Sequence, residues 1–202
     1  MPSQPAETLV PPALLDAWQL EFSIHKPSRL LRRDIELVFR PDLQAEYERH
    51  PDGATAGTSL DDFLSSHLLA VPTWQPASLD LSEISDPVNE MRRGLLERFD
   101  EWCAAVRPAL DPFWSDASCP VEGCAHFGSR TSVIYNELEG LTTLLKYQSV
   151  PVGCCGIVLH PSWGRQAYPV TFFTTAPLER LQLAIAAAEQ SKSKRAATMH
   201  SA

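Results

Sequence analysis

Large apolar side chains recur every three or four positions between residues 86 and 107. This spacing lines them up along one side of an α-helix. Asp86 can cap such a helix, Pro87 suits its first turn, and Pro108 is expected to end it. The apolar positions are Ile84, Val88, Met91, Leu95, Phe99, Trp102 and Val106. A single stripe of this kind predicts a helix that packs against a broad surface, most simply a β-sheet.

Alternation of apolar and polar residues predicts a half-buried β-strand over Trp18–His25. Residues Asp34–Arg40 are also expected to form a strand, which Pro41 ends. Four further strands are predicted in the second half of the chain. They cover residues 132–137, 142–148, 152–160 and 168–174.

Ser59, followed by Asp62 three residues later, resembles a capping box and predicts a short helix. The remaining expected segments are a helix at 42–50, a loop at 51–58, an extended connector at 70–83 and a last helix from about Pro177 to Gln190. Strands, helices, more strands and a final helix do not alternate regularly, as they would in a doubly wound fold.

This order of elements predicts an α+β fold. An antiparallel β-meander is expected to pack against the long amphipathic helix 86–107 and a C-terminal helix, with a Cys-rich loop between the long helix and the meander. We expect a loosely ordered, Pro-rich N-terminus at 1–13, a single α+β domain at 14–190 and a basic disordered tail at 191–202.

The composition is that of a globular protein, with 44% hydrophobic and 21% charged residues among 202. No apolar run reaches the roughly 18–20 residues that a membrane span needs. The first residues have no basic segment, and Pro11 and Pro12 interrupt their apolar stretch. We therefore expect no signal peptide and a cytoplasmic location. In a reducing compartment, the five cysteines favour a metal site or catalysis over disulfides.

The net charge of −8 argues against a dedicated duplex-DNA binder, which is usually basic. Residues 41–101 carry 13 acidic and 4 basic residues. Two basic segments, 26–40 and 190–202, lie outside that region. This pattern suits a protein partner, a locally held nucleic acid or an ordinary solvated surface.

One segment, SCPVEGCAHFG at 118–128, carries residues with metal-binding chemistry. Cys119 and Cys124 are close enough in sequence for both thiolates to reach one zinc ion, and His126 follows two residues later. Cys154 or Cys155 is the expected fourth ligand, because adjacent strand residues point to opposite faces. The pattern favours a structural zinc site. Ordinary buried thiols and a redox or catalytic thiol remain as alternatives.

Partner-binding residues are expected in two places. Arg29, Arg32 and Arg33 form the first basic segment, and His160, Trp163 and Arg165 share a compact loop. His50-x-Asp52 also begins a two-histidine, one-carboxylate pattern that His160 would complete, but the strands of such a site are not evident around residue 50. We interpret His50-Pro51-Asp52 as a surface turn.

Three functions fit the sequence. The first, which we favour, is a non-enzymatic recognition or adaptor protein with a zinc-stabilised loop that binds a protein or a nucleic acid. The second is a small enzyme in which Cys119, Cys124 and His126 hold a catalytic zinc and Glu122 or Glu137 is the base. The third is a metal-free acidic inhibitor. No nucleotide-binding, hydrolase or zinc-protease motif is present, which favours the first.

Overall fold

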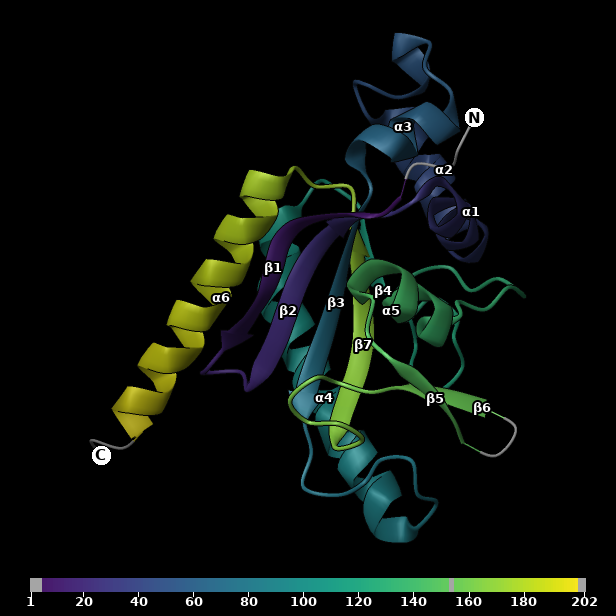
Figure 1. Cartoon of the computed structure of the whole chain (residues 1–202). Helices are drawn as coiled ribbons and strands as arrows, with labels where there is room; N and C mark the ends of the chain where they lie inside the picture. Colours follow the sequence, from purple (N-terminus) through teal and green to yellow (C-terminus); the bar gives the residue numbers. More distant parts are fainter. Residues whose placement is uncertain (1–4, 153–154, 200–202) are drawn as a thin grey trace.

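The computed structural model describes residues 5–152 and 155–199 (Figure 1). The strands are β1 (Glu7–Leu15), β2 (Leu20–Lys26), β3 (Leu69–Pro76), β4 (Ser115–Ala117), β5 (Ser149–Val152), β6 (Cys155–Val158) and β7 (Ala167–Thr174). The helices are α1 (Arg29–Val38), α2 (Arg40–Arg49), the short 3₁₀ helix η1 (Ala54–Ala56), α3 (Leu60–His67), α4 (Asp86–Leu110), α5 (Glu137–Leu145) and α6 (Leu178–Met199).

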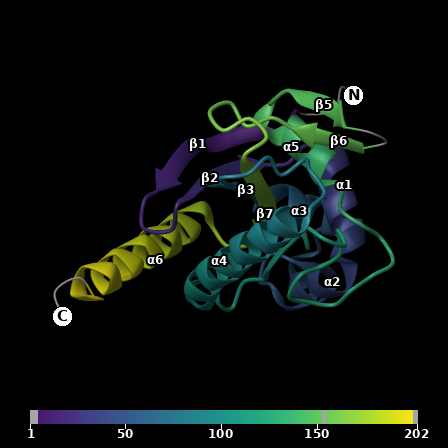
Figure 2. The same cartoon turned by 90° about the horizontal axis from the view of Figure 1, so that it is seen from below.

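The main sheet has the strand order β1-β2-β3-β7-β4, and every neighbouring pair is antiparallel. Helices α4 and α6 cover one face, and α5 with the β5–β6 hairpin lies over the other (Figure 2). Helices α1, α2 and α3 gather at one end of the sheet (Figure 1). The predicted α+β class is confirmed, including the antiparallel sheet, the long helix and the C-terminal helix.

Strands β3 and β7 are buried on both faces of the sheet. Their side chains point alternately to the two faces and join separate apolar clusters. Tyr168, Val170 and Phe172 of β7 join the cluster under α4 and α6, whereas Phe173 joins the cluster at the α1–α3 end. A third, smaller cluster lies under α5 and the β5–β6 hairpin. It contains Trp74, Leu141, Val158 and Ala167.

The predicted helices occur, with small differences at their ends. Ser59 caps α3 by accepting a hydrogen bond from the Asp62 backbone N–H. Ser85, rather than Asp86, caps α4, and Asp86 lies in the first turn. The helix also continues past Pro108 to Leu110. The 42–50 prediction corresponds to α2.

Two predicted strands are helices, so those predictions were wrong. Asp34–Arg40 lies largely in α1, where Leu31, Ile35 and Val38 repeat at helical spacing and are all buried. Residues 142–148 overlap α5, which begins at the Asn136 cap. In both places a short apolar alternation also fits a helix, and the capping residue and packing decide between them. Residues 132–136 form no strand, and Glu137 begins α5.

The expected connector at 70–83 contains a central strand, β3. Its side chains from Leu69 to Gln75 are buried on both faces, so the segment lacks the alternation of a half-buried strand. The strand predicted over 152–160 is shorter in the structure: β6 covers Cys155–Val158 and forms a hairpin with β5, which ends at Val152. The strand predicted at 168–174 is confirmed as β7.

Both chain ends are more regular than expected. β1 is an edge strand paired with β2, and its register shifts between Val10 and Ala13, where Pro11 and Pro12 lie. The expectation of a loosely ordered segment is therefore wrong for Glu7 onward. Helix α6 continues through the predicted disordered tail as far as Met199. No helix among the described residues is long and apolar enough to cross a membrane.

Candidate functional site

A tight turn after β4 brings Cys119 and Cys124 together. The Cys119 backbone N–H donates to the Cys124 carbonyl at 2.8 Å, and the Gly123 N–H donates to the Cys119 carbonyl at 2.7 Å. Ser118 and Ala125 pair as an antiparallel bridge on either side of the turn. Gly123 has φ +72°, a conformation that favours glycine. The sequence therefore closes a rigid loop with both thiols at its base, which we call the Cys119–Cys124 loop.

The two thiols share their surroundings with the Glu122 carboxylate. Donor atoms of Cys119, Glu122 and Cys124 all lie within 4.8 Å of one another, and both cysteines are buried without a disulfide. The Cys124 thiol donates to Glu122 Oε2 at 3.5 Å, and Arg130 pairs with the same oxygen at 2.5 Å. Burial, followed by the bond to Glu122, raises the pKa of Cys124.

The structure does not bring the other predicted zinc ligands to these thiols. His126 points to α4, where its Nε2 lies 2.7 Å from Asp100 Oδ1. Cys154 and the side chain of Cys155 lie outside the described residues. Glu122, which the sequence suggested only as a base, is the third potential metal ligand of the cluster. Its position between the two cysteines in the sequence could have indicated this role.

A cavity of about 420 Å³ adjoins this loop. Its walls come from the loop, α5, β6, the start of β7 and the segment before α4. The polar and ionisable side chains in its lining are Ser82, Arg92, Ser118, Cys119, Glu122, Tyr135, Glu137, Arg165 and Tyr168. Exposed apolar side chains of Val121 and Ile134 lie on the loop side of the opening.

Glu137 is the most constrained carboxylate of the cavity. Its Oε2 accepts a hydrogen bond from Ser118 Oγ at 2.6 Å, and its Oε1 accepts one from Thr171 Oγ1. Burial raises the pKa of Glu137, and these two hydrogen bonds oppose the shift. Burial also raises the pKa of Tyr168, so its hydroxyl stays protonated at neutral pH. The inner wall therefore offers hydroxyl donors and one carboxylate of reduced acidity, while Arg92 and Arg165 supply positive charge.

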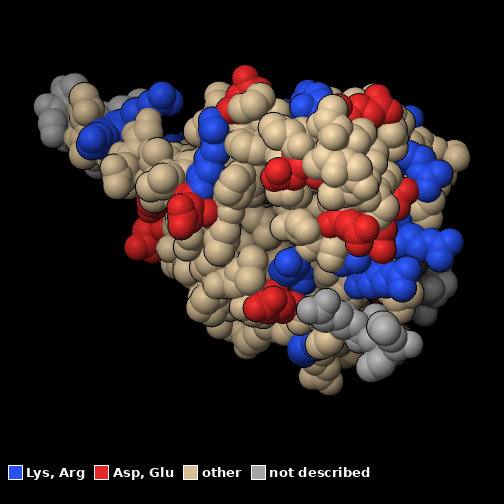
Figure 3. Space-filling model, turned by 90° about the horizontal axis from the view of Figure 1, so that it is seen from above, with Lys and Arg blue, Asp and Glu red and all other residues tan. Residues whose placement is uncertain are grey.

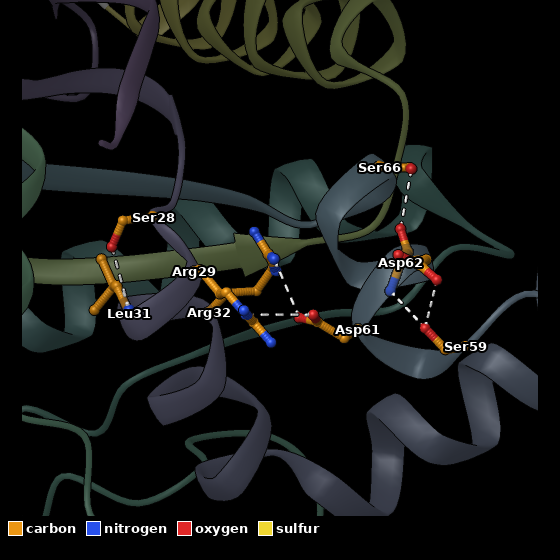
Figure 4. A network of polar contacts seen from close by, with 8 residues as sticks. All are labelled: Ser28, Arg29, Leu31, Arg32, Ser59, Asp61, Asp62 and Ser66. Carbon is orange, nitrogen blue, oxygen red and sulfur yellow. Dashed lines mark hydrogen bonds and ion pairs between the residues drawn. The ribbon is translucent and has the colours of Figure 1, made fainter. Parts of the chain in front are cut away.

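The predicted basic segment is largely tied up in ion pairs. Arg29 and Arg32 both contact Asp61 of α3, at 3.6 and 3.1 Å (Figure 4). Arg32 is buried, whereas Arg33 is exposed. Viewed from the α1–α3 end, acidic and basic side chains are interspersed (Figure 3). This end does not present the continuous positive surface that nucleic-acid binding requires.

The loop that carries the other predicted partner residues lies at the opposite end of the sheet from α1 (Figure 1). His160 is buried and holds this loop: its Nδ1 accepts from the backbone N–H groups of Ser162 and Trp163, and its Nε2 lies 3.0 Å from Glu21. The Trp163 ring stacks on it at 4.1 Å between centroids. Arg165 is exposed and reaches the cavity. The six predicted residues therefore do not form one surface.

A second group of metal-type ligands joins His50 and Asp52 to His67, a residue that the sequence analysis did not single out. Here the Asp52 backbone N–H donates to His50 Nδ1 at 3.1 Å, as expected for a turn-capping residue. His67 Nε2 lies 3.5 Å from Asp52 Oδ2. His160, the expected partner of this motif, belongs to a different region. The surface-turn interpretation holds for Pro51 and Asp52, which are exposed, but His50 itself is buried against neighbouring aromatic rings.

Comparison with known proteins places the chain in a family. Residues 7–185 match the family described as methylmalonic aciduria and homocystinuria type D protein. The chain is 28% identical over 162 residues to the cobalamin trafficking protein CblD of Rattus norvegicus, and 26% to that of Homo sapiens. These alignments cover 78% of this chain and 47% of each relative, so the chain spans about half the length of the curated relatives it matches. Since the family match includes every described strand, helices α1 to α5 and the beginning of α6, the chain belongs to the family of the methylmalonic aciduria and homocystinuria type D protein.

Proposed function

We propose that this chain is a non-enzymatic adaptor in cobalamin trafficking. The observation that carries the proposal is the family match over residues 7–185, together with relatives named for cobalamin trafficking. The cavity beside the Cys119–Cys124 loop is the proposed recognition site. It combines exposed apolar side chains with Arg165 at its edge, a combination typical of binding surfaces.

The size of the cavity favours an adaptor over a carrier. A volume of about 420 Å³ falls within the range of sites for drug-sized ligands. Cobalamin, with its corrin ring and nucleotide arm, is much larger than such a ligand. The cavity can therefore receive only part of the cofactor. In this proposal a second protein holds the rest, and the chain recognises that cobalamin-loaded protein.

A protein partner is favoured over a nucleic acid by charge. Arg29 and Arg32 are paired with Asp61, and the net charge of −8 repels phosphates. An acidic chain with a small positive rim at Arg92 and Arg165 instead suits a partner of matching local charge.

The test is an association experiment with the full chain. We expect gel filtration to show a complex with a cobalamin-loaded carrier protein of the same organism, and equilibrium dialysis to show little binding of free cobalamin. Arg165→Glu should weaken the complex by about 10-fold, because it reverses a charge at the rim. Arg33→Glu is the matched control, since Arg33 is exposed at the opposite end and should have no effect.

Two outcomes would contradict the proposal. Tight binding of free cobalamin by the chain alone would make it a carrier. If the chain binds neither free cobalamin nor the cobalamin-loaded protein, the proposed role in trafficking is removed. Binding to nucleic acid that weakens steeply with salt would support the nucleic-acid function instead.

A further inference from the structure

We propose that the Cys119–Cys124 loop binds one zinc ion through Cys119, Glu122 and Cys124. This inference does not rest on the role in cobalamin trafficking. It differs from the ligand set expected from the sequence, because Glu122 replaces His126. Three features of the described residues support it: the spacing of the donor atoms, the rigidity of the loop and the balance of charge around it.

The donor atoms are close to the positions that zinc requires. Zinc lies about 2.3 Å from a thiolate sulfur and about 2.0–2.2 Å from a carboxylate oxygen, so two ligands of a tetrahedral ion are roughly 3.5–3.8 Å apart. The three donors already lie within 4.8 Å of one another. Closing the site therefore needs side-chain rotations that move each donor by about 1 Å or less, with no change in the backbone.

The backbone around the donors is fixed before any ion binds. The loop is closed by its own two hydrogen bonds, and the Tyr135 N–H donates to the Gly123 carbonyl at 2.7 Å. A Cβ added at Gly123 would lie 3.0 Å from the Ile134 Cβ and 3.2 Å from the Tyr135 carbonyl oxygen. The positive φ and this close approach explain why position 123 is glycine, and the three backbone hydrogen bonds hold the turn in one conformation, which reduces the entropy lost on binding.

The surroundings balance the charge of an occupied site. Two thiolates and one carboxylate around a divalent ion leave a net charge of −1. Arg130 contacts Glu122 at 2.5 Å and supplies the compensating positive charge. Such an outer-shell partner also orients the ligand. His126 is not a ligand in this arrangement, because it is not among the donors that lie within 4.8 Å of one another.

Three protein ligands leave a fourth position, which we assign to water in the free chain. Cys119 and Glu122 both line the cavity, so this position adjoins it. Zinc would then fix one wall of the cavity by tying both ends of the loop together.

The experiment measures zinc affinity of the reduced full chain by competition with a chromophoric chelator, and zinc content by elemental analysis. We expect one zinc per chain. Cys119→Ser and Cys124→Ser should each lower the affinity by more than about 100-fold, beyond the loss typical of an outer-shell partner. Glu122→Gln removes a proposed ligand and should lower the affinity by at least the roughly 10- to 100-fold typical of an outer-shell partner, and this variant keeps the proposal testable if the cysteine variants fail to fold. Substitution of cobalt should give a thiolate-to-metal absorption band in the parent that the cysteine variants lack.

Two controls decide the ligand set. His126→Asn tests the alternative third ligand and should leave zinc affinity unchanged. Cys103→Ala removes a buried thiol of α4 and should also leave the zinc affinity unchanged. The proposal is overturned if the reduced parent binds no zinc, if the freshly isolated chain contains a Cys119–Cys124 disulfide, or if His126→Asn abolishes binding while Glu122→Gln does not.

Discussion

The sheet face under α4 and α6 is filled by one large apolar cluster, whereas the opposite face carries smaller clusters, a cavity and buried polar groups. Fully buried aromatic side chains occur in the large cluster, for example Trp102 and Phe172, and also in the cluster at the α1–α3 end, for example Phe173. The opposite face buries His25 and encloses Glu137, a carboxylate that faces the cavity.

This difference shows how stability and function are divided. Apolar burial supplies most of the free energy of folding, and the cluster under α4 and α6 contains the most buried residues of the three clusters. The other face is covered by short elements and a two-stranded hairpin, which leave space between them. The proposed recognition site therefore lies on the face that carries the cavity.

The largest expected effect compares truncations on the two faces. Phe172→Ala should lower the free energy of unfolding by about 3–5 kcal/mol, because the side chain is fully buried in the large cluster. Leu138→Ala, in the half-buried wall of the cavity, should cost no more than about 2 kcal/mol. Urea denaturation of both variants measures the two losses. Equal losses would show that the two faces contribute alike.

A smaller effect tests the polar burial on the second face. Desolvation lowers the pKa of His25 to about 4, and the ring contacts the hydroxyls of Ser23 and Thr8. The unfolded chain binds a proton at about pH 6.5, so stability is lost as the pH falls from 6.5 toward 4. The resulting loss in the free energy of unfolding should reach about 2 kcal/mol at pH 5.

Urea denaturation of the parent and a His25→Gln variant between pH 7 and pH 5 isolates the His25 term. The parent should lose more stability than the variant, and the difference should grow as the pH falls. Parallel pH profiles would mean that His25 is not the group responsible. Burial also lowers the pKa of His67. Because the parent and the variant both contain His67, its contribution cancels in the comparison.

Half-buried and strongly periodic elements were predictable from the sequence. β2, α3, α4 and α6 each have a clear pattern or cap, and β7, although buried on both faces, is rich in aromatic and β-branched residues. β3 was not recognised, because a strand buried on both faces loses its alternation and this one contains Pro72. α1 was mistaken for a strand over seven residues, a length at which the two periodicities overlap.

Part of the candidate site was also predictable. The spacing of Cys119 and Cys124 indicated that they meet, and they do. The direction of His126 depended on Asp100, a residue of α4 that no local pattern connects to the loop. The cavity itself comes from the packing of α5 and β6 against β7, and both α5 and the hairpin had been assigned incorrectly.

The smallest expected effect lies at the outer edge of the α4–α6 face. Lys192 of α6 lies 3.0 Å from Glu101 of α4, and its ammonium is 4.4 Å from the centroid of the Trp18 ring. Glu101 is exposed, so the ion pair should contribute no more than about 0.5 kcal/mol. The contact with Trp18 should add about 0.5–1 kcal/mol. We expect salt to screen this contact less than the ion pair.

A double-mutant cycle with Lys192→Met and Glu101→Gln, repeated at high salt, separates the two contributions. The coupling should vanish at high salt while the effect of Lys192→Met alone persists, because the apolar stem and the aromatic contact then carry it. If the effect of Lys192→Met also vanishes at high salt, the ion pair with Glu101 alone holds the end of α6, and the contact with the Trp18 ring contributes nothing.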